Sequence, residues 1–331
     1  MSDDVKKKPD QTAYLCVLLV CMTLGSQQVA VKLAAPYVDT IFQIGLRSII
    51  AFTVLFLGVL IFRKKSTRLI DGTLKAGIAA GILMALEYFF MAEGLKRTNA
   101  AHISVFMYTA PIFVAFGLHF LKADERMNKV EWAGVLLAFG GTVFSFLAKP
   151  GGLSNYDFNS MFFGDILGIC SGLAWASTTI VIRTTSLTSA NPIRTLIYQM
   201  LGVSILLTGY CLAVGKTSFV FSTTAVLSLG YQGLILCSTI CALWFWLLTK
   251  YSASRISQLM LLTPVFGVIF GVTILGETIS WSFIVGAACV LSGIIVIGVG
   301  GKLKKQVTTS KAGNDTPVEY SIKSTAPVPG K

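Results

Sequence analysis

The sequence predicts an all-α integral membrane protein with ten transmembrane helices, arranged as two inverted repeats of five helices. Three observations lead to this fold class. Of the 331 residues, 54% are hydrophobic and only 13% are charged, whereas about 25% of the residues in a typical soluble domain are charged. The apolar residues occur in blocks of about 20, the length that crosses a bilayer core as a helix. The two halves of the chain also share motifs in the same order.

Short polar breaks divide the apolar blocks into ten candidate spans. In chain order the spans are residues 13–34, 41–62, 74–95, 100–121, 130–148, 164–183, 193–214, 224–248, 255–276 and 281–300. The first span resembles a signal peptide because lysines precede it, but its apolar run is long and it has a partner in the repeat. We therefore expect an N-terminal segment at 1–12, repeats at 13–148 and 164–300, and a disordered polar tail at 301–331.

The basic residues near the span ends predict the orientation. Most of them fall on the side of the membrane that also holds both termini, and positively charged loops remain in the cytoplasm. The opposite side carries few basic residues: Lys32, Lys96, Arg97, Lys149 and Lys216. Both termini are therefore expected to be cytoplasmic, in a multi-pass protein of the plasma membrane, which is the inner membrane in a bacterium.

The internal repeat is the most informative feature of the sequence. LGSQQVAVK at 24–32 aligns with WASTTIVIR at 175–183, and AAHISVFMYTAPIF at 100–113 aligns with ASRISQLMLLTPVF at 253–266. Five spans in each repeat reverse the direction of the second copy, which is a recurring construction of secondary transporters. A duplicated, purely structural membrane protein is the alternative.

The chain resembles the drug/metabolite transporter superfamily, in particular the ten-helix type with two tandem EamA domains. The resemblance covers about residues 13–300 and is carried by GSQQVAVKLA, QIGLRSI and AEGLKRTNAAHISVFMYTAPIF, and by TPVFGVIFGVTILGETISW with the glycine-rich span that follows. A family Trp-Gly pair is replaced here by Leu24-Gly25. The resemblance implies substrate translocation by alternating access without ATP hydrolysis, around a cavity formed by spans 1, 3, 4, 6, 8 and 9.

Strongly polar residues inside a membrane are costly, so they are candidates for function. Gln27 and Gln28 in the first span, Arg47 in the second and Glu87 in the third lie at similar depths if each residue rises 1.5 Å. Two roles remain open for Arg47 and Glu87. They form an ion pair that locks two spans together, or they belong to a substrate site in which Glu87 carries a proton.

Aromatic and amide side chains extend the predicted substrate cavity, and two prolines are predicted hinges. The further cavity candidates are Tyr88, Tyr108, Trp175, Tyr231, Gln232, Trp244, Trp246 and Gln258. Anchoring at the membrane interface is the alternative role for the aromatic residues. Pro111 and Pro264 occupy matched positions in the repeats, and a proline inside a helix removes a hydrogen bond and kinks it.

The remaining polar residues point to interfaces rather than to metals. Lys32 and Arg183 are repeat partners, and each is expected either to anchor a span end or to attract an anionic substrate. His102 and His119 are too far apart to share a metal and are expected to form interfacial hydrogen bonds. The seven cysteines lie in apolar blocks without histidine or acidic partners, so no metal and no cofactor is predicted.

These observations favour a transporter of small organic metabolites, in particular an exporter of amino acids or related compounds, with protons as a candidate coupling ion. The alternatives are an importer or exchanger of nucleotide-linked or phosphorylated metabolites, and a non-transporting scaffold or sensor. An enzyme is not expected, because no clustered Asp, Glu and His motif is present. The net charge of +12 is spread over loops and tails, which does not favour nucleic acid.

Overall fold

The computed structural model describes residues 10–61, 72–122, 126–147, 155–251 and 259–314. In these residues the chain is helical throughout, and the one β-type contact is an isolated bridge between Val38 and Phe219. Eight helical segments of the described part are long and apolar enough to cross a membrane. The all-α membrane fold is therefore confirmed at this level.

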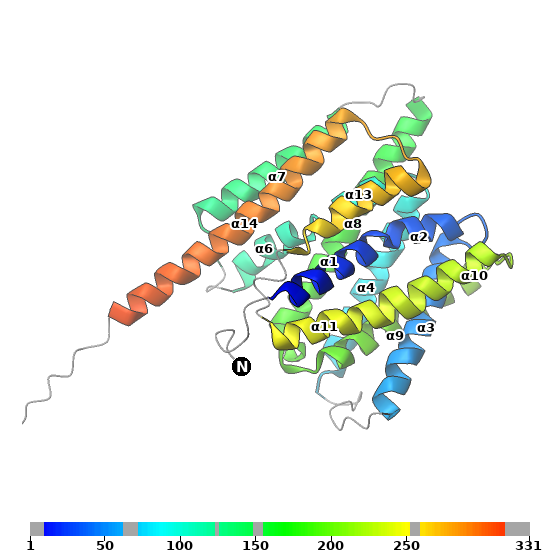
Figure 1. The fold of residues 1–331 in the computed structure, drawn as a ribbon, viewed down its shortest axis with the longest axis horizontal. Helices are drawn as coiled ribbons and strands as arrows, with labels where there is room; N and C mark the ends of the chain where they lie inside the picture. Colours follow the sequence, from blue (N-terminus) through cyan, green and yellow to red (C-terminus); the bar gives the residue numbers. More distant parts are fainter. Residues whose placement is uncertain (1–9, 62–71, 123–125, 148–154, 252–258, 315–331) are drawn as a thin grey trace, which may run out of the picture.

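The first half of the chain contributes seven helices (Figure 1). They are α1 (Gln11–Gly25), α2 (Gln27–Ala34), α3 (Thr40–Ile61), α4 (Leu74–Leu95), α5 (Ala100–Met107), α6 (Ala110–Leu121) and α7 (Lys129–Leu147). Helices α1 and α2 together form one membrane-length segment, and so do α5 and α6. The first half thus follows the predicted spans closely.

The second half has a more broken helical pattern. Its helices are α8 (Asn155–Thr184), the 3-10 turn η3 (Ser186–Ser189), α9 (Pro192–Val214), α10 (Thr223–Gly230), the π-helical segment η4 (Tyr231–Ile240), α11 (Cys241–Lys250), α13 (Leu262–Leu275) and α14 (Trp281–Asn314). Of the predicted ninth span, residues 255–258 lie outside the described residues. Helix α13 is apolar but has only 14 residues.

The two prolines that were predicted to kink continuous helices instead begin new ones. Between α5 and α6 the chain forms a tighter turn at Tyr108 and Thr109, whose N–H groups donate to carbonyls three residues earlier, and Pro111 is in the first turn of α6. Pro264 is likewise in the first turn of α13. Proline lacks an N–H, and the first turn is where that donor has no intrahelical partner. Each predicted kink is therefore a helix break.

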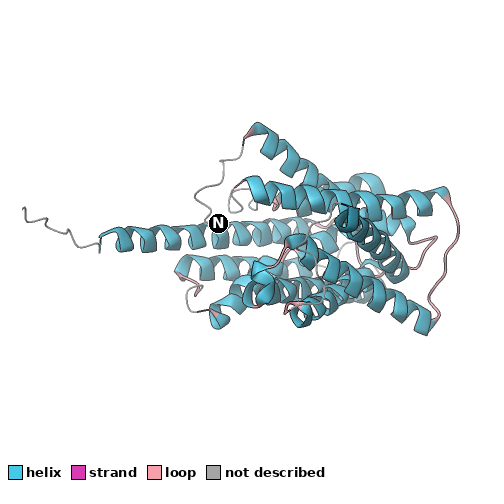
Figure 2. Cartoon of the chain, turned by 90° about the horizontal axis from the view of Figure 1, so that it is seen from below, coloured by secondary structure: helices cyan, strands magenta, loops and turns pink. Residues whose placement is uncertain are grey.

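Helix α14 continues to Asn314, beyond residue 300 where the sequence predicts a disordered tail. Its C-terminal part runs past the other helices, as the long helix on the left of Figure 2 shows. The stretch from Lys302 to Ala312 contains neither glycine nor proline, so nothing in it ends the preceding helix. Residues 315–331 lie outside the described residues.

Helix packing follows the internal repeat. Most of the contacts between helices of the two halves have a counterpart when the halves are exchanged. Helix α4 packs on α9 as α3 packs on η4, and α5 packs on α8 as α13 packs on α1. The pairs α7–α14, α3–α9 and α5–α13 join equivalent elements. The structure therefore carries the same twofold relation as the sequence motifs.

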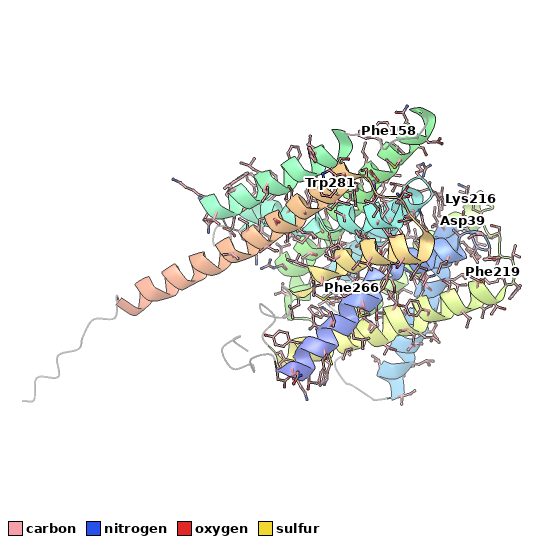
Figure 3. All side chains as sticks on the ribbon, turned by 45° about the horizontal axis from the view of Figure 1, so that its top comes forward. Asp39, Phe158, Lys216, Phe219, Phe266 and Trp281 are labelled. Atoms are coloured by element: carbon pink, nitrogen blue, oxygen red, sulfur yellow. The ribbon has the colours of Figure 1, made fainter. Side chains whose placement is uncertain are left out.

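The outward-facing side chains are largely apolar, as a lipid-exposed surface requires. Large exposed hydrophobic residues occur on most of the long helices, including Ile61, Phe120, Leu136, Phe139, Ile205, Leu212 and Trp281. Such extensive apolar exposure would be unusual for a soluble monomer. Figure 3 shows Asp39, Lys216 and Phe219 together at one end of the molecule.

Helices α7 and α14 lie side by side in Figure 1 and approach each other through small residues. A Cβ atom added at Gly141 would lie 2.5 Å from Cys289 Cβ and 2.7 Å from the carbonyl oxygen of Gly286. Gly134 faces Gly293 in the same way, with 2.7 Å to its carbonyl oxygen. Without a hydrophobic driving force between helices in lipid, this close backbone contact is what holds such a pair together.

The substitution Gly141→Ala is expected to push α7 away from α14 and to destabilise the protein by about 1–3 kcal/mol, the usual cost of overpacking. The measurement is the melting temperature of the purified protein in detergent. Gly140→Ala is the matched control, because a Cβ at Gly140 would meet no atom within 4 Å. Equal melting temperatures for the two variants would contradict the close contact.

Candidate functional site

A cavity of about 400 Å³ lies among helices from both halves of the chain. Its wall is apolar and aromatic with a few polar groups, as is usual for sites that bind small molecules. The lining residues are Leu24, Gln27, Gln28, Met84, Glu87, Tyr88, Met107, Tyr108, Pro111, Trp175, Leu196, Ile240, Cys241, Trp244, Met260 and Leu261. We call this space the central cavity.

The central cavity brings together most of the residues singled out in the sequence. Gln27, Gln28, Glu87, Tyr88, Tyr108, Trp175 and Trp244 all line it, and so does Pro111. The lining comes from spans 1, 3, 4, 6 and 8 and from the residues before α13, with Leu196 of α9 as one addition. The distribution therefore matches the one that the family resemblance implies.

The two glutamines have weak hydrogen-bond partners. Gln27 donates from Nε2 to the sulfur of Met91 at 3.4 Å, and Gln28 donates from Nε2 to the sulfur of Met107 at 3.8 Å. Thioether sulfur is a weak acceptor. Gln28 Oε1 is buried and has no hydrogen-bond partner. Both amides therefore retain capacity for another molecule.

Glu87 is 5% exposed, and its carboxylate forms neither a hydrogen bond nor an ion pair with any described residue. Its backbone carbonyl oxygen accepts a hydrogen bond from Ser171 Oγ at 2.9 Å, which ties α4 to α8. Nearby, the rings of Tyr108 and Trp175 meet edge to face with centroids 5.2 Å apart. A carboxylate that no described side chain hydrogen-bonds, and on which only the more distant charge of Arg47 acts, thus lies in a largely aromatic cavity.

Arg47 is fully buried but does not line the central cavity. Its Nη1 donates to Gln232 Oε1 at 3.2 Å, and its guanidinium lies 4.8 Å from the ring centre of Tyr88. Gln232 in turn donates to Gln43 Oε1 at 3.1 Å and to Ser228 Oγ at 3.0 Å.

The ion pair between Arg47 and Glu87 that the sequence suggested as a lock does not form in the structure. Arg47 instead packs on the ring of Tyr88, the residue that follows Glu87. Its Nε and Nη2 have no hydrogen-bond partner. Arg47 and Glu87 therefore lie at similar depths in their two helices without forming an ion pair.

Some predicted cavity residues lie elsewhere. Tyr231 shares a hydrogen bond of 2.5 Å between its hydroxyl and that of Ser26, and it lines a separate surface hollow with Leu33 and Leu227. Trp246 is exposed and lies under Lys250 Nζ, 4.7 Å from its ring centre. Pro264 is buried in α13 and does not line the cavity. Gln258 lies outside the described residues.

One end of the protein is closed beyond the glutamines by an ion pair. Lys32, one turn after Gln28, contacts Glu277 with 3.0 Å between Nζ and Oε1. The Glu277 carboxylate also accepts from the backbone N–H groups of Ala100 at 2.6 Å and Ala101 at 3.0 Å, the first residues of α5. Gly276, with a φ of +66°, ends α13 and turns the chain so that Glu277 reaches this helix terminus. In the sequence, Glu277 was only one letter of the TPVFGVIFGVTILGETISW motif and received no role.

Lys32 and Glu277 also line a polar hollow of about 630 Å³ at this end. Asp39 and Lys96 belong to the same hollow and form an ion pair of 3.2 Å. Partial burial lowers the pKa of Lys96, but the hydrogen bonds and charges of Glu93 and Asp39 outweigh burial and raise it above its ordinary value. The hollow shares no lining residue with the central cavity.

The other end is more open. A second hollow of about 370 Å³ shares two of its lining residues, Pro111 and Trp175, with the central cavity. Arg183 lines this hollow together with Glu131. The repeat partners Lys32 and Arg183 therefore lie at two different mouths, of which only the one at Arg183 adjoins the central cavity.

A buried polar cluster formed by Asp165, Thr98 and His102 was missed in the sequence. Asp165 of α8 accepts from Thr98 Oγ1 at 2.5 Å and lies 2.9 Å from His102 Nδ1. The His102 ring stacks on Phe283 with centroids 3.9 Å apart. His102 was expected at an interface but is 3% exposed, because α14 covers it. His119 does form a local hydrogen bond, since its Nδ1 accepts from the backbone N–H of Met127 at 2.8 Å.

Replacing Asp165 is expected to destabilise the protein, since Thr98 and His102 would lose a shared buried acceptor. Leaving a buried donor without a partner costs about 1–3 kcal/mol, so Asp165→Leu should lower the melting temperature by several degrees. Asp39→Asn is the control, because asparagine keeps the cap on α3 and an exposed ion pair contributes little. An unchanged melting temperature for Asp165→Leu would contradict a structural role.

Known proteins resemble the chain over most of its length. The sequence profile of the EamA-like transporter family matches residues 11–147 and 162–299. The uncharacterized transporter YoaV of Bacillus subtilis is 27% identical over 283 residues, which cover 85% of this chain and 95% of YoaV. The protein named "Probable amino-acid metabolite efflux pump" of Salmonella typhimurium is 24% identical, over 88% of this chain and 97% of that protein.

A protein of known crystal structure has the same fold, with a TM-score of 0.60 at 16% identity. The match covers 87% of this chain and 98% of that protein. The profile matches well over half of the chain, in two copies that follow the internal repeat. The chain is therefore a multi-pass membrane protein that belongs to the EamA-like transporter family.

Proposed function

We propose that this protein is a secondary transporter that moves small organic metabolites by alternating access, and that it exports amino acids or related compounds. The observation that carries the proposal is the central cavity, which adjoins a hollow at one end of the molecule and is separated from the other end by the Lys32–Glu277 pair. A transporter with one closed and one accessible side has this arrangement. The name of the Salmonella typhimurium relative supports amino-acid compounds.

The fold that we propose for this function has ten spans in two inverted repeats. Helices α7 and α13 would complete the eight membrane-length segments, and the exchange symmetry of the helix contacts supports the pairing of the halves. We place the repeats at 13–148 and 164–300. The segments 1–12 and 301–331 would lie in the cytoplasm, with the protein in the plasma membrane.

The composition of the central cavity favours amino-acid compounds over phosphorylated ones. A phosphate or a nucleotide diphosphate is usually held by several arginine or lysine side chains. None of the lining residues in the described part of the chain is basic, and the guanidinium of Arg47 lies against the ring of Tyr88. The importer of phosphorylated metabolites is therefore the weaker alternative.

Transport can be measured in liposomes that contain the purified protein and unlabelled amino acids inside. Labelled amino acids added outside, one at a time, are expected to accumulate by exchange several-fold above protein-free liposomes for at least one of them. Trp244→Ala should lower this exchange because Trp244 lines the central cavity. Trp281→Ala is the matched control, since Trp281 is 75% exposed on the outer surface. If no amino acid exchanges, the proposed substrate class is wrong.

The same liposomes test proton coupling, for which we propose Glu87 as the carrier. An imposed pH gradient should drive net uptake by the original protein but not by Glu87→Gln, whereas exchange at equal pH should remain once the amino-acid concentration is high enough to saturate the variant. A carrier group must release its proton for net coupled movement but not for exchange. Normal gradient-driven uptake by Glu87→Gln would assign the coupling to another group.

The proposed orientation can be tested with single cysteines in a cysteine-free background. Lys216→Cys should react with a membrane-impermeant thiol reagent added to intact cells, and Lys250→Cys should not. Both original side chains are exposed, so both cysteines should react after the cells are opened, which serves as the control. Labelling of Lys250→Cys alone in intact cells would invert the orientation.

A further inference from the structure

We propose that the central cavity recognises its substrate by an ammonium group, which the Glu87 carboxylate and Gln28 Oε1 accept. The inference rests on the proposed function, because it specifies the ligand of the same cavity. It names a substrate class: compounds with a protonated primary amine attached to an apolar or aromatic body.

The first reason is the lack of partners for two buried acceptors. Glu87 and Gln28 are 5% and 4% exposed, and both line the central cavity. The Glu87 side chain bonds to none of the described residues, and Gln28 Oε1 is an orphaned acceptor. A buried carboxylate is costly unless it is paired and hydrogen-bonded. An ammonium brings three donors and a positive charge, which is what this pair of acceptors lacks.

The second reason is the charge of the cavity wall. Glu87 is the single ionisable acid or base among the described lining residues, apart from tyrosine and cysteine groups. Arg47 is kept out of the cavity by its hydrogen bond to Gln232 and by its packing on Tyr88. A ligand that carries only a carboxylate would face Glu87 without any cation in the wall. Charge complementarity therefore favours a cationic ligand group.

The third reason is the aromatic surface around these acceptors. Tyr108, Trp175 and Trp244 line the same cavity, and Tyr108 and Trp175 meet edge to face. Aromatic faces attract ammonium groups through their quadrupoles, and they also bury apolar ligand surface. The volume of about 400 Å³ is within the range of small-molecule sites. The wall thus fits both the charged and the apolar part of such an amine.

The test compares two probes that have the same ring and a similar length but opposite charge: 2-phenylethylamine and 3-phenylpropionate. Binding to the purified full chain in detergent is measured by titration calorimetry. The amine is expected to bind at least about tenfold more tightly than the carboxylate. The free energy of a hydrogen bond to a charged group corresponds to a change in affinity of about this size. Equal or tighter binding of the carboxylate, or no binding of the amine, would overturn the proposal.

Two variants assign the binding to the two acceptors. Glu87→Gln should weaken amine binding about tenfold or more, and Gln28→Leu should weaken it by a smaller factor. Glu93→Gln is the matched control on the same helix, because Glu93 lies among Lys96 and Arg97 outside the cavity. Circular dichroism and gel filtration establish folding. If Glu87→Gln does not fold, Glu87→Asp replaces it, and unchanged amine affinity in that variant and in Gln28→Leu would overturn the proposal.

The outcomes separate this inference from the proposed function. Amine binding that depends on Glu87, without any exchange in liposomes, would leave the ammonium site standing and remove transport. Exchange of amino acids together with equal affinity for both probes would support transport and remove the ammonium site.

Discussion

Inside a bilayer every polar group needs a partner within the protein, and this constraint organises the structure. Hydroxyl groups on the long helices meet it locally by donating to a carbonyl one turn earlier, as Ser48 donates to Ile44, Thr142 to Ala138 and Thr178 to Ala174. At the helix ends, Glu277 accepts from two N–H groups that α5 leaves free. Among the buried atoms without a hydrogen-bond partner are Gln28 Oε1 and two nitrogens of Arg47, and the Glu87 carboxylate forms no hydrogen bond with a described residue. They gather in and beside one cavity, which is why that cavity carries the functional argument.

The internal repeat explains how one cavity acquires two unequal mouths. Lys32 and Arg183 descend from the same motif position, yet Lys32 lies at the mouth that is closed by Glu277, and Arg183 lies at a mouth that adjoins the cavity. The two halves are related by the repeat, but one mouth is closed and the other adjoins the cavity, so the arrangement is not symmetric. Exchange of the states between the halves would close the mouth at Arg183 and open the one at Lys32. In the function that we propose, alternating access would follow from the repeat as a geometric property, and the breaks before Pro111 and Pro264 would be the places where the helices bend.

The sequence was sufficient to predict the membrane class, the repeat and most of the cavity wall, because apolar block length and motif order report directly on spans and their depth. It was not sufficient to predict in which direction a side chain points from its helix, and hence which residue it contacts. Arg47 and Glu87 lie at similar depths, but Arg47 turns to Gln232 and Tyr88, and that angular choice depends on packing. Asp165 was overlooked because it lies near the start of its span, and Thr98 and His102 are distant in the chain. Helix breaks at the prolines likewise depend on how neighbouring helices cover the freed carbonyl groups.

The tightest helix packing and the lining of the central cavity are largely assigned to different helices. Helices α7 and α14 form the most extensive helix pair through glycine contacts, and neither contributes a residue to the central cavity. Helix α3 contributes no lining residue either, although the guanidinium of its Arg47 packs on the ring of Tyr88. A cavity that keeps a carboxylate without a partner is destabilised by that group. Packing elsewhere must offset this cost, and the tight α7–α14 contact supplies such packing without touching the residues that line the central cavity. Lining residues can therefore change with the ligand while the scaffold remains the same.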